Sequence, residues 1–479
     1  MSIKKATTIL VLLFILSLAS TTILAEEVAR VPRFNFNSIS SDDLIGQMNI
    51  FYPFKNSKNS LFYTDTRYRI DINDVHEWNF GLGYRYKLQN VDNHIAGIYI
   101  YKDRREEYDT YWDMWTIGGE ILTNKLDIRA NAYIADDKTI DNLSGDSVEV
   151  SNGQIVYQKS FYTSMDGLDF EIGKRWTETD SIFNNIGVYA RVFKFFEKGI
   201  TDMNGKEIRI NKLYGNKAGA YSKFGIKWQD DNLRGSETKA TFSFSLPIGK
   251  GSVKEIKEKD IDTLEKRMTE QPVRDIDIVV GELNADTSNK ENTEVLAHDS
   301  YTGQELGDVY YITAEGTGDG SKNNPTNLTD AINHSKENDV LILLGDNGEI
   351  VHSSLSLKNG QKLLSPGGYL SVSADTKGSR KTNFKPSGNQ ATLTGDGEFS
   401  NYITLQKNNA VSGLNTDRFQ IEGNASGNTN INKNTIKNSP GDAITISISS
   451  SGRNITNITK NNIINSGGDS IELMIYGTE

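Results

Sequence analysis

The chain has 479 residues, and its 63 acidic residues against 52 basic ones give a formal net charge of −11. With 36% hydrophobic residues and a mean hydropathy of −0.50, it is too polar for a helical protein with several membrane spans. The acidic balance argues against nucleic acid as a partner, because phosphate binding needs a basic surface. The absence of cysteine excludes disulfides, thiolate metal sites and cysteine nucleophiles. At about 100–200 residues per domain, the length predicts roughly two to four domains.

Residues 1–25 read as a secretory signal peptide. Two lysines form a positive start, an apolar core follows, and small-residue cleavage sites end at Ala19 or Ala25. The core is shorter than the roughly 20 residues that a membrane-spanning helix needs. An uncleaved N-terminal anchor is the alternative, whereas a lipoprotein anchor is excluded because no cysteine follows. We expect an exported protein whose mature chain begins with a short periplasmic segment over residues 26–42.

Residues 43–250 alternate between apolar and polar side chains in segments of about 9–12 residues, the length of tilted transmembrane strands. In residues 77–88, for example, Trp, Phe, Leu and Tyr alternate with Asn, Gly, Arg and Lys. The pattern predicts about twelve strands, near 44–54, 60–72, 77–88, 93–103, 110–122, 125–135, 154–162, 167–176, 185–195, 206–213, 217–228 and 238–248.

A soluble β-sandwich also alternates, so the period alone does not decide the environment of these strands. Charged side chains fall on one face, as in a wet lumen: Arg67, Arg69, Arg85, Arg129 and Arg175. Aromatic side chains lie near the predicted strand ends, as in interfacial girdles: Trp78, Tyr101, Trp112, Trp176 and Trp228. A closed barrel leaves no strand edge unpaired in lipid. We therefore predict an antiparallel transmembrane β-barrel in the outer membrane of a bacterium.

Several blocks of this region resemble the barrel of inverse autotransporters of the intimin–invasin type. They are NFGLGYRY (79–86), IAGIYIYKDRR (95–105), IGGEILTNKLDIRANAYI (117–134), GLDFEIGKRW (167–176), YARVFKFF (189–196) and LEKRMTEQPVRDIDIVV (264–280). The resemblance covers roughly residues 33–280 and implies a twelve-stranded N-terminal barrel that exports whatever follows it. It also implies periplasmic chaperones and the barrel-assembly machinery as partners, besides membrane lipid. The short segment before the barrel leaves no room for the periplasmic peptidoglycan-binding module of some members.

Residues 251–308 form a linker. Over 251–271 the period of two is lost, and apolar residues recur at i, i+3 and i+7 before Pro272. This spacing predicts a short amphipathic helix, which the family resemblance places in or near the barrel lumen; a solvated connector is the alternative. Residues 281–308 are polar and nearly free of aromatic side chains, which predicts a flexible spacer.

Residues 309–479 predict a coiled parallel sheet. The opening elements are a strand at VYYI (309–312), one short helix over 328–336, a buried strand at DVLILL (339–344) and short apolar segments at 355–357 and 361–364. This opening resembles the N-terminal cap and first turns of right-handed parallel β-helices of the pectate-lyase-like type. The fold class is thus all-β: barrel, linker helix and β-helix.

An internal repeat supports stacked coils independently. INKNTIKNSPGDAI (431–444) aligns with ITKNNIINSGGDSI (458–471) at a shift of 27 residues. A fixed shift predicts Ile above Ile inside the coils and Asn above Asn at their corners, where Asn tolerates left-handed backbone. Lys407 and Asn408 mark the preceding coil. Because no capping segment follows the last coil near Ile475, we infer a short passenger, truncated from a longer ancestor.

The sequence shows no catalytic, cofactor-binding or metal-binding constellation, and binding residues are unknown. Asp442 and Asp469 stack one coil apart, close to the lower limit of the roughly 5–10 Å that glycoside hydrolysis requires, but as repeat corners. Other candidates considered are Arg380, Arg418 and Arg453, which flank no acidic cluster; His334 and His352, expected at the surface; Ser321, which lacks a nucleophile elbow; and GTGDG (316–320), a turn rather than a phosphate loop.

These parts predict a self-exporting surface protein of adhesin or invasin type. The barrel would anchor and translocate the C-terminal rod, which would contact host cells, other bacteria or surface glycans. We expect no enzyme activity and no cofactor. The alternatives are a surface-tethered polysaccharide lyase or hydrolase, and a pore with an inert appendage. The sequence does not identify the receptor.

Overall fold

The structure is a computed structural model that describes residues 30–40, 44–71, 75–88, 94–177, 184–215, 220–248, 264–275, 277–283, 294–397, 401–424, 426–449 and 454–476. The predicted signal peptide lies outside the described residues. The chain divides into two compact units, Met1–Ile140 with Tyr162–Glu282, and Asp141–Phe161 with Leu283–Glu479. None of the described helices is both long and apolar enough to cross a bilayer.

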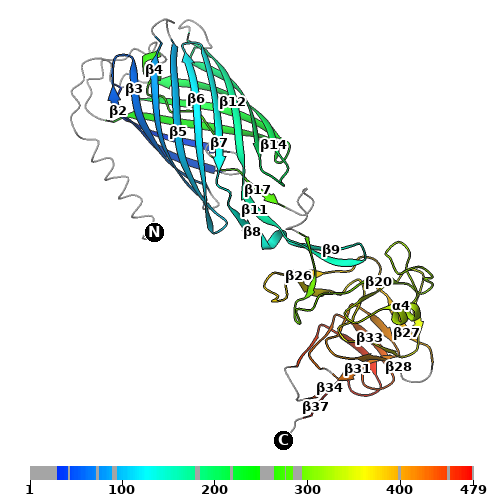
Figure 1. The fold of residues 1–479 in the computed structure, drawn as a ribbon. Helices are drawn as coiled ribbons and strands as arrows, with labels where there is room; N and C mark the ends of the chain where they lie inside the picture. Colours follow the sequence, from blue (N-terminus) through cyan, green and yellow to red (C-terminus); the bar gives the residue numbers. More distant parts are fainter. Residues whose placement is uncertain are drawn as a thin grey trace. The chain divides into compact units, whose positions relative to one another are not determined.

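The first unit is a closed antiparallel barrel of twelve described strands (Figure 1). They are β1 (Arg33–Ser40), β2 (Leu44–Asn56), β3 (Ser60–Ile70), β4 (His76–Lys87), β5 (His94–Glu107), β6 (Thr110–Thr123), β7 (Leu126–Ala135), β12 (Asp166–Trp176), β13 (Ile186–Phe196), β14 (Met203–Gly215), β15 (Tyr221–Asp231) and β16 (Gly235–Pro247). Strand β1 pairs with both β2 and β16, which closes the barrel. The predicted strand number is confirmed.

Two strand assignments from the sequence are wrong. Strand β1 lies within the segment that was expected to be a periplasmic arm, residues 26–42. The predicted barrel strand near 154–162 instead contributes β10 (Gln154–Gln158) to a separate three-stranded sheet. Strand β1, RFNFNSIS, was missed because its apolar alternation stops after Phe34 and Phe36. The strand near 154–162 was misplaced because alternation records that one face of a strand is apolar, but not which surface that face contacts.

The two faces of the barrel wall differ sharply in chemistry. All five arginines predicted to face a lumen are buried inside, with 0–8% of their surface exposed. Large apolar residues point outward and are exposed, among them Phe80, Leu82, Ile98, Ile117 and Ile226. An apolar exterior around a charged interior is typical of a barrel in lipid. The predicted aromatic girdle needs correction, since Tyr101 and Trp112 are fully buried and face inward.

The second unit contains three stacks of parallel strands. The first runs β20 (Val309–Ile312), β21 (Val340–Leu343), β24 (Lys362–Leu364), β29 (Ala410–Ser412), β32 (Asn428–Asn432) and β35 (Ile455–Thr459). The second runs β22 (Ile350–His352), β27 (Thr392–Gly395), β30 (Asn415–Asp417), β33 (Thr435–Ser439) and β36 (Asn462–Ser466). The third runs β23 (Leu355–Ser356), β28 (Asn401–Leu405), β31 (Phe419–Asn424), β34 (Ile444–Ser449) and β37 (Ile471–Tyr476).

Strands β20 and β21 both belong to the first stack; from β21 onward the chain visits the three stacks in turn, with β25 and β26 inserted after β24 as part of another sheet. The predicted register is confirmed: Ile431 pairs with Ile458, and Ile436 with Ile463. The spacing of the preceding coil differs from that of the repeat. Asn408 lies one coil below Asn428, so these two coils are 20 residues apart, whereas the repeated coils are 27 residues apart. Coil length therefore varies while strand register is kept, and the extra residues fall in the corners.

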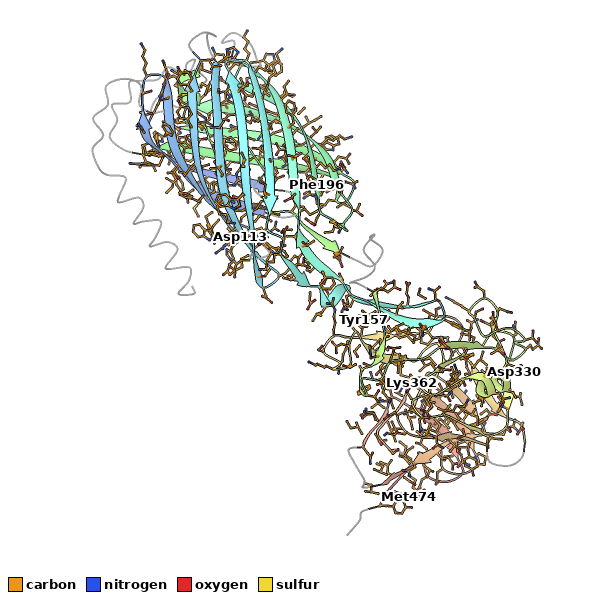
Figure 2. The ribbon with its side chains drawn as sticks, viewed as in Figure 1. Asp113, Tyr157, Phe196, Asp330, Lys362 and Met474 are labelled. Atoms are coloured by element: carbon orange, nitrogen blue, oxygen red, sulfur yellow. The ribbon has the colours of Figure 1, made fainter. Side chains whose placement is uncertain are left out.

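Apolar residues fill the inside of the three stacks, and Figure 2 shows the side chains of this unit. The largest cluster includes Leu341, Leu363, Leu393, Ile403, Val411, Ile421, Ile431 and Ile444, each fully buried. The predicted helix is confirmed as α4 (Leu328–His334), which Asn327 caps by accepting from the Asp330 amide. The predicted strand at 339–344 is confirmed as β21, whose four residues are all buried.

Three smaller sheets complete the described structure. One combines β9 (Ser147–Ser151) and β10 with β18 (Glu294–Leu296), and a second combines β19 (His298–Asp299), β25 (Leu370–Ser373) and β26 (Lys381–Phe384). The third combines β8 (Thr139–Asp141), β11 (Phe161–Ser164) and β17 (Val280–Leu283). A 3-10 turn, Leu143–Gly145, lies between β8 and β9.

Candidate functional site: the occupied barrel lumen

A segment of the linker lies inside the barrel. Its described part starts with α2 (Leu264–Arg267), a single helical turn within the stretch that the sequence predicts to be helical, and then continues without regular structure in the described residues up to β17. The part of the predicted helix over 251–263 lies outside the described residues. Pro272 and the charged residues around it favour an extended chain here, because proline cannot continue a helix.

The first turn of this segment is anchored near one end of the barrel. Glu265 accepts from Nε of Arg30 at 2.8 Å and forms an ion pair with Lys87, the last residue of β4. Met268 is fully buried in an apolar cluster with Phe51, Leu61, Tyr63, Ile95 and Leu122. Burial of one methionine side chain contributes about 1.5–3 kcal/mol, so this cluster fixes the start of the segment.

Arg85 of β4 holds the backbone of the segment. Its Nη1 donates to the carbonyl oxygens of Arg267, Met268 and Glu270 at 3.2, 2.9 and 2.6 Å. Its Nε donates to Glu120 at 2.7 Å, which neutralises the guanidinium charge. A chain without a strand partner leaves its carbonyls unsatisfied, and here a wall arginine supplies the missing donors.

Ion pairs hold the side chains of the segment to the wall. Arg267 pairs with Asp127 at 2.7 Å, Glu270 with Arg175 at 3.0 Å, and Asp275 with Arg191 at 3.3 Å. Arg274 pairs with Asp103 at 2.6 Å, and both side chains are fully buried. Breaking one partner of a buried pair is costly because it leaves an uncompensated charge.

The wall also binds the later part of the segment, residues 272–279, through its backbone carbonyls. Arg67 donates to Pro272 at 2.8 Å, the Tyr99 hydroxyl to Val273 at 3.2 Å, and Arg105 to Ile278 at 3.0 Å. The amide of Met165 donates to Val279 at 2.9 Å. The wall thus contacts the main chain along most of its course.

The order of these contacts gives the direction of the segment. Glu265 pairs with Lys87, where β4 ends, whereas Ile278 bonds Arg105, near the far end of β5. Strands β4 and β5 are antiparallel neighbours, so the end of β5 lies at the opposite rim from the end of β4. The segment therefore runs along the whole lumen from one rim to the other.

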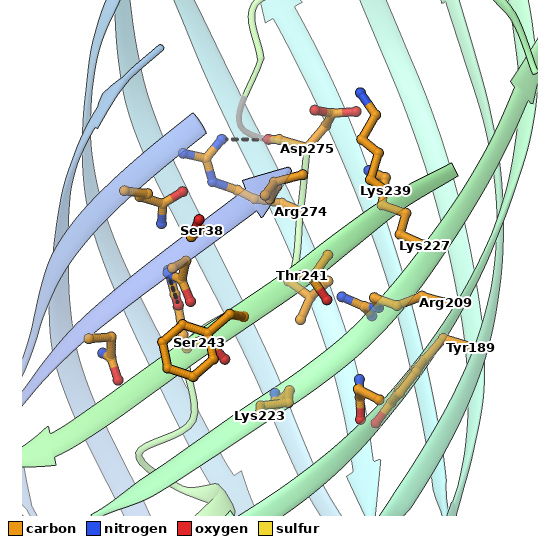
Figure 3. A pocket seen from close by; sticks show the side chains of 18 of the residues that line it. Ser38, Tyr189, Arg209, Lys223, Lys227, Lys239, Thr241, Ser243, Arg274 and Asp275 are labelled. Atoms are coloured by element: carbon orange, nitrogen blue, oxygen red, sulfur yellow. Dashed lines mark hydrogen bonds between the residues drawn. The ribbon is translucent and has the colours of Figure 1, made fainter. Parts of the chain in front are cut away.

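A cavity of about 260 Å³ remains between the segment and the wall. Figure 3 shows Arg209, Lys223, Lys227 and Lys239 on the wall strands around it, with Arg274 and Asp275 of the segment. Eleven basic residues and five acidic ones line the cavity. Basic side chains therefore outnumber acidic ones on the surface of the cavity, although most of them form ion pairs, for example Arg67 with Asp65 and Arg274 with Asp103.

The structure places the sequence candidates outside this lumen. Asp442 accepts from the backbone amide of Asp469 at 2.6 Å, so this pair forms a stacked corner. His334 bonds the carbonyl of Asp330, and His352 bonds that of Ser353. Ser321 lies in a turn, where its amide donates to Asp319. Among the described residues, no group of three or more His, Asp or Glu side chains is arranged to hold a metal ion.

The arginine candidates have different surroundings. Arg418 pairs with its neighbour Asp417 at 3.4 Å, and Arg453 lies outside the described residues. Arg380 does face two carboxylates, Asp141 and Asp146. Sequence inspection missed this cluster because the acids precede the arginine by more than 230 positions.

Residues 29–193 match the family model of the inverse autotransporter β-domain. The matched stretch runs from the start of the described barrel into β13. No curated protein matches the sequence. Similar solved structures include a chain from a study of in-meso crystallization of membrane proteins, 13% identical over 53% of this chain and 100% of its own, with a TM-score of 0.42.

Two further solved structures are similar to the barrel of this chain. The KdgM porin is 8% identical over 44% of this chain and 97% of its own, with a TM-score of 0.29. The β-domain of the Bordetella autotransporter BrkA is 11% identical over 45% of this chain and 96% of its own, with a TM-score of 0.24. Likenesses of this size carry no information about function.

Proposed function

We propose that this chain is an outer-membrane protein that exports its own C-terminal unit through its barrel. The observation that carries the proposal is the linker segment that runs through the lumen from rim to rim. A chain that has passed its C-terminal part outward must leave such a segment behind. The match to the inverse autotransporter β-domain supports the same conclusion, as does the apolar exterior of the barrel. Barrel-assembly machinery and periplasmic chaperones are then the expected assembly partners.

The way the wall binds the segment suits transport. Arg67, Arg85, Tyr99 and Arg105 donate to backbone carbonyls, which every residue of a polypeptide carries. A wall that recognises the main chain accepts many different sequences in turn. The ion pairs with Glu270, Arg274 and Asp275 then fix the final register of the resting segment.

At the surface, we propose that the second unit is a right-handed β-helix that serves in attachment to host cells, other bacteria or glycans, without catalysis. Its stacked strands form a rod of repeated corners and exposed side chains, a geometry suited to extended contacts. Its candidate acids and histidines each hold a turn or a corner, as Asp442 and His334 do. This supports an adhesive role over a polysaccharide-cleaving one.

An epitope tag after Glu479 tests export. On intact cells we expect antibody and protease to reach the tag while a periplasmic marker stays protected. If the tag is reached after the outer membrane is broken and not before, the second unit is periplasmic and the export proposal is wrong.

Attachment is tested on cells that display the full chain. We expect them to bind host cells or immobilised glycans better than cells that display a chain ending at Leu283, which retains barrel and segment. Release of unsaturated or reducing sugars from acidic polysaccharides by the full chain would instead identify an enzyme.

A further inference from the structure

The segment between barrel strands β7 and β12 is unusual. These strands are direct neighbours in the barrel, yet residues 136–165 separate them, whereas Tyr108 and Asp109 alone connect β5 to β6. Most of the long connection, residues Asp141–Phe161, belongs to the second unit rather than to the barrel. A piece inserted between two barrel strands is thus built into the fold of the exported part.

This piece contains a hairpin that its own sequence specifies. Strands β9 and β10 pair with Ser151 opposite Gln154, so two residues, Asn152 and Gly153, form the turn. Both have positive φ, 50° and 79°. Asn-Gly with two positive φ values is the tight turn that matches the twist of a hairpin, so the hairpin needs no later part of the chain to form.

The free edge of the hairpin pairs with β18, near the start of the C-terminal part of the second unit. Strand β10 is antiparallel to β18, with Val156 opposite Leu296, and the Ala297 amide donates to Ile155 at 2.9 Å. The amide of Val309, where β20 starts the first parallel stack, donates to Gly153 at 2.7 Å. The hairpin therefore pairs with residues 294–297, which the sequence predicts to be part of a flexible spacer, and with the start of β20.

The apolar face of the hairpin closes the core at the same place. Ile155 and Tyr157 are 1% and 0% exposed and join a cluster with Val309, Tyr311 and Val340. The opposite end differs: in β37, the last described strand, Leu473 and Ile475 are 52% and 75% exposed. The hairpin thus covers the first end of the stacked coils, and each later coil lies farther from the hairpin.

An ion cluster, in which Arg380 and Asp146 are buried and Asp141 is exposed, joins the hairpin piece to a distant part of the second unit. Arg380 donates to Asp146 from Nε at 2.6 Å and to Asp141, and lies 4.8 Å from the centre of the Phe161 ring. Tyr157 donates to Asp146 at 2.7 Å. Burial and the adjacent carboxylate raise the pKa of Tyr157, so its hydroxyl stays protonated and remains a donor.

We propose that the β9–β10 hairpin is a folding template: carried by the barrel, it offers a preformed strand edge and apolar face on which the exported chain begins to fold. The partner is the chain's own segment from Glu294 to the first parallel strand. This proposal deepens the proposed function and rests on it, because a template serves a chain that arrives unfolded. Each later coil then stacks on the one before.

The test compares folding rates of full-length variants. Gly153→Ala strains the hairpin turn at φ 79° without crowding, since an added methyl group meets no described atom within 4 Å. Gly348→Ala is the matched control, with φ 108° and equally open surroundings, in a turn of the second unit. A second pair matches residue type and burial: Ile155→Ala in the hairpin against Ile444→Ala in β34, 1% and 0% exposed.

The readout is the half-time with which the second unit becomes protease-resistant after the C-terminal tag reaches the surface. A template forms before the rest, so hairpin variants should lengthen this half-time by about ten-fold or more, while the controls mainly speed loss of resistance. Equal half-times for all four variants would overturn the proposal.

Failure of export is distinguishable from failure of the template. If the tag of the unmodified chain does not reach the surface, the proposed function fails. The same four variants are then compared while the full chain refolds into lipid vesicles, and the same order of half-times decides whether the hairpin is a template.

Discussion

On the lumen face of the barrel, glycines lie opposite aromatic rings of a neighbouring strand. A Cβ on Gly83 would meet the Tyr63 ring at 2.1 Å, and one on Gly118 would meet the Tyr99 ring at the same distance. Similar pairs are Gly81 with Tyr101, Gly167 with Phe195, Gly173 with Tyr189 and Gly205 with Phe193. The ring occupies the space that a Cβ on the glycine would need, which fixes the register of the two strands. A glycine in a strand usually weakens it, and here the covering ring compensates.

Two adjacent glycines allow a matched test of this packing. Gly118→Ala should destabilise the barrel by about 1–3 kcal/mol, because the methyl group forces the Tyr99 ring aside. Gly119→Ala should be nearly neutral, because its methyl group would point outward with its nearest neighbour at 3.8 Å. Urea unfolding in vesicles, followed by the heat-modifiable mobility of the barrel on gels, measures both. Equal loss in the two variants would contradict the packing argument.

In the second unit, a buried asparagine side chain fixes neighbouring coils relative to each other. Asn434 is 1% exposed; its amide group donates to Val411 and to Asn461, and its oxygen accepts from Leu414 at 3.0 Å. One side chain therefore satisfies backbone groups of the coil below and is linked to the coil above.

Asn434→Ala should lower the free energy of unfolding of the second unit by about 2–4 kcal/mol, because buried backbone groups lose their partners. Asn462→Ala is the control, since this side chain is exposed and its backbone amide still bonds Asn434. All five tryptophans lie in the first unit, so resistance to protease in urea, not fluorescence, is the measurement. A control that loses as much stability as the variant would exclude this explanation.

At the scale of elements, the segment inside the barrel is held by the wall along most of its length. Its carbonyls are bonded by side chains of β3, β4 and β5, and its charges are paired with the wall. The segment is therefore part of the folded barrel, although it belongs to no strand of it. The lumen of this barrel is therefore occluded by a segment of the same chain.

Truncation separates the barrel from its occupant. A chain ending at Pro247 lacks the segment and should conduct ions steadily in a planar bilayer, because the lumen is emptied. A chain ending at Leu283 retains the segment and should conduct several-fold less. Similar conductance from both chains would show that the segment does not rest in the lumen, and would favour a simple pore.

At the scale of the whole molecule, charge is distributed unevenly. The chain is acidic overall, yet the cavity beside the segment is lined by eleven basic and five acidic residues. Low-dielectric walls strengthen the field of such a cavity. Because more basic than acidic side chains face the cavity directly, we expect small anions to be favoured over cations along the remaining open path.

The residual current of the intact chain should accordingly prefer chloride over potassium, as measured by the reversal potential in a salt gradient. Lys223→Gln, at the cavity, should weaken this preference. Lys194→Gln removes the same charge from an exposed position that pairs with Asp202 and should leave the preference unchanged. A cation-selective current would show that ions take another path.

Much of this architecture was predictable because it follows from local periodicity. Alternation gave eleven of the twelve barrel strands and the charged lumen face, and the 27-residue repeat gave the stacking of Ile431 on Ile458. Prediction failed where the same local pattern serves two environments. The apolar face of residues 154–158 contacts the core of the second unit, not lipid, and Tyr101 and Trp112 face inward. In the described part of the linker, α2 ends at Arg267 rather than continuing to Gln271, because wall side chains satisfy the extended backbone that follows it.

The sequence by itself determined the strand periods, the order of the parts and the coil register, since each depends on residues close together in the chain. Tertiary structure alone decided what lies inside the barrel and what covers the start of the stacked coils. Arg85 with the carbonyl of Met268, and Arg380 with Asp146, are separated by 183 and 234 positions. No local pattern encodes such contacts, because they form when distant segments desolvate each other's charges and must satisfy them together.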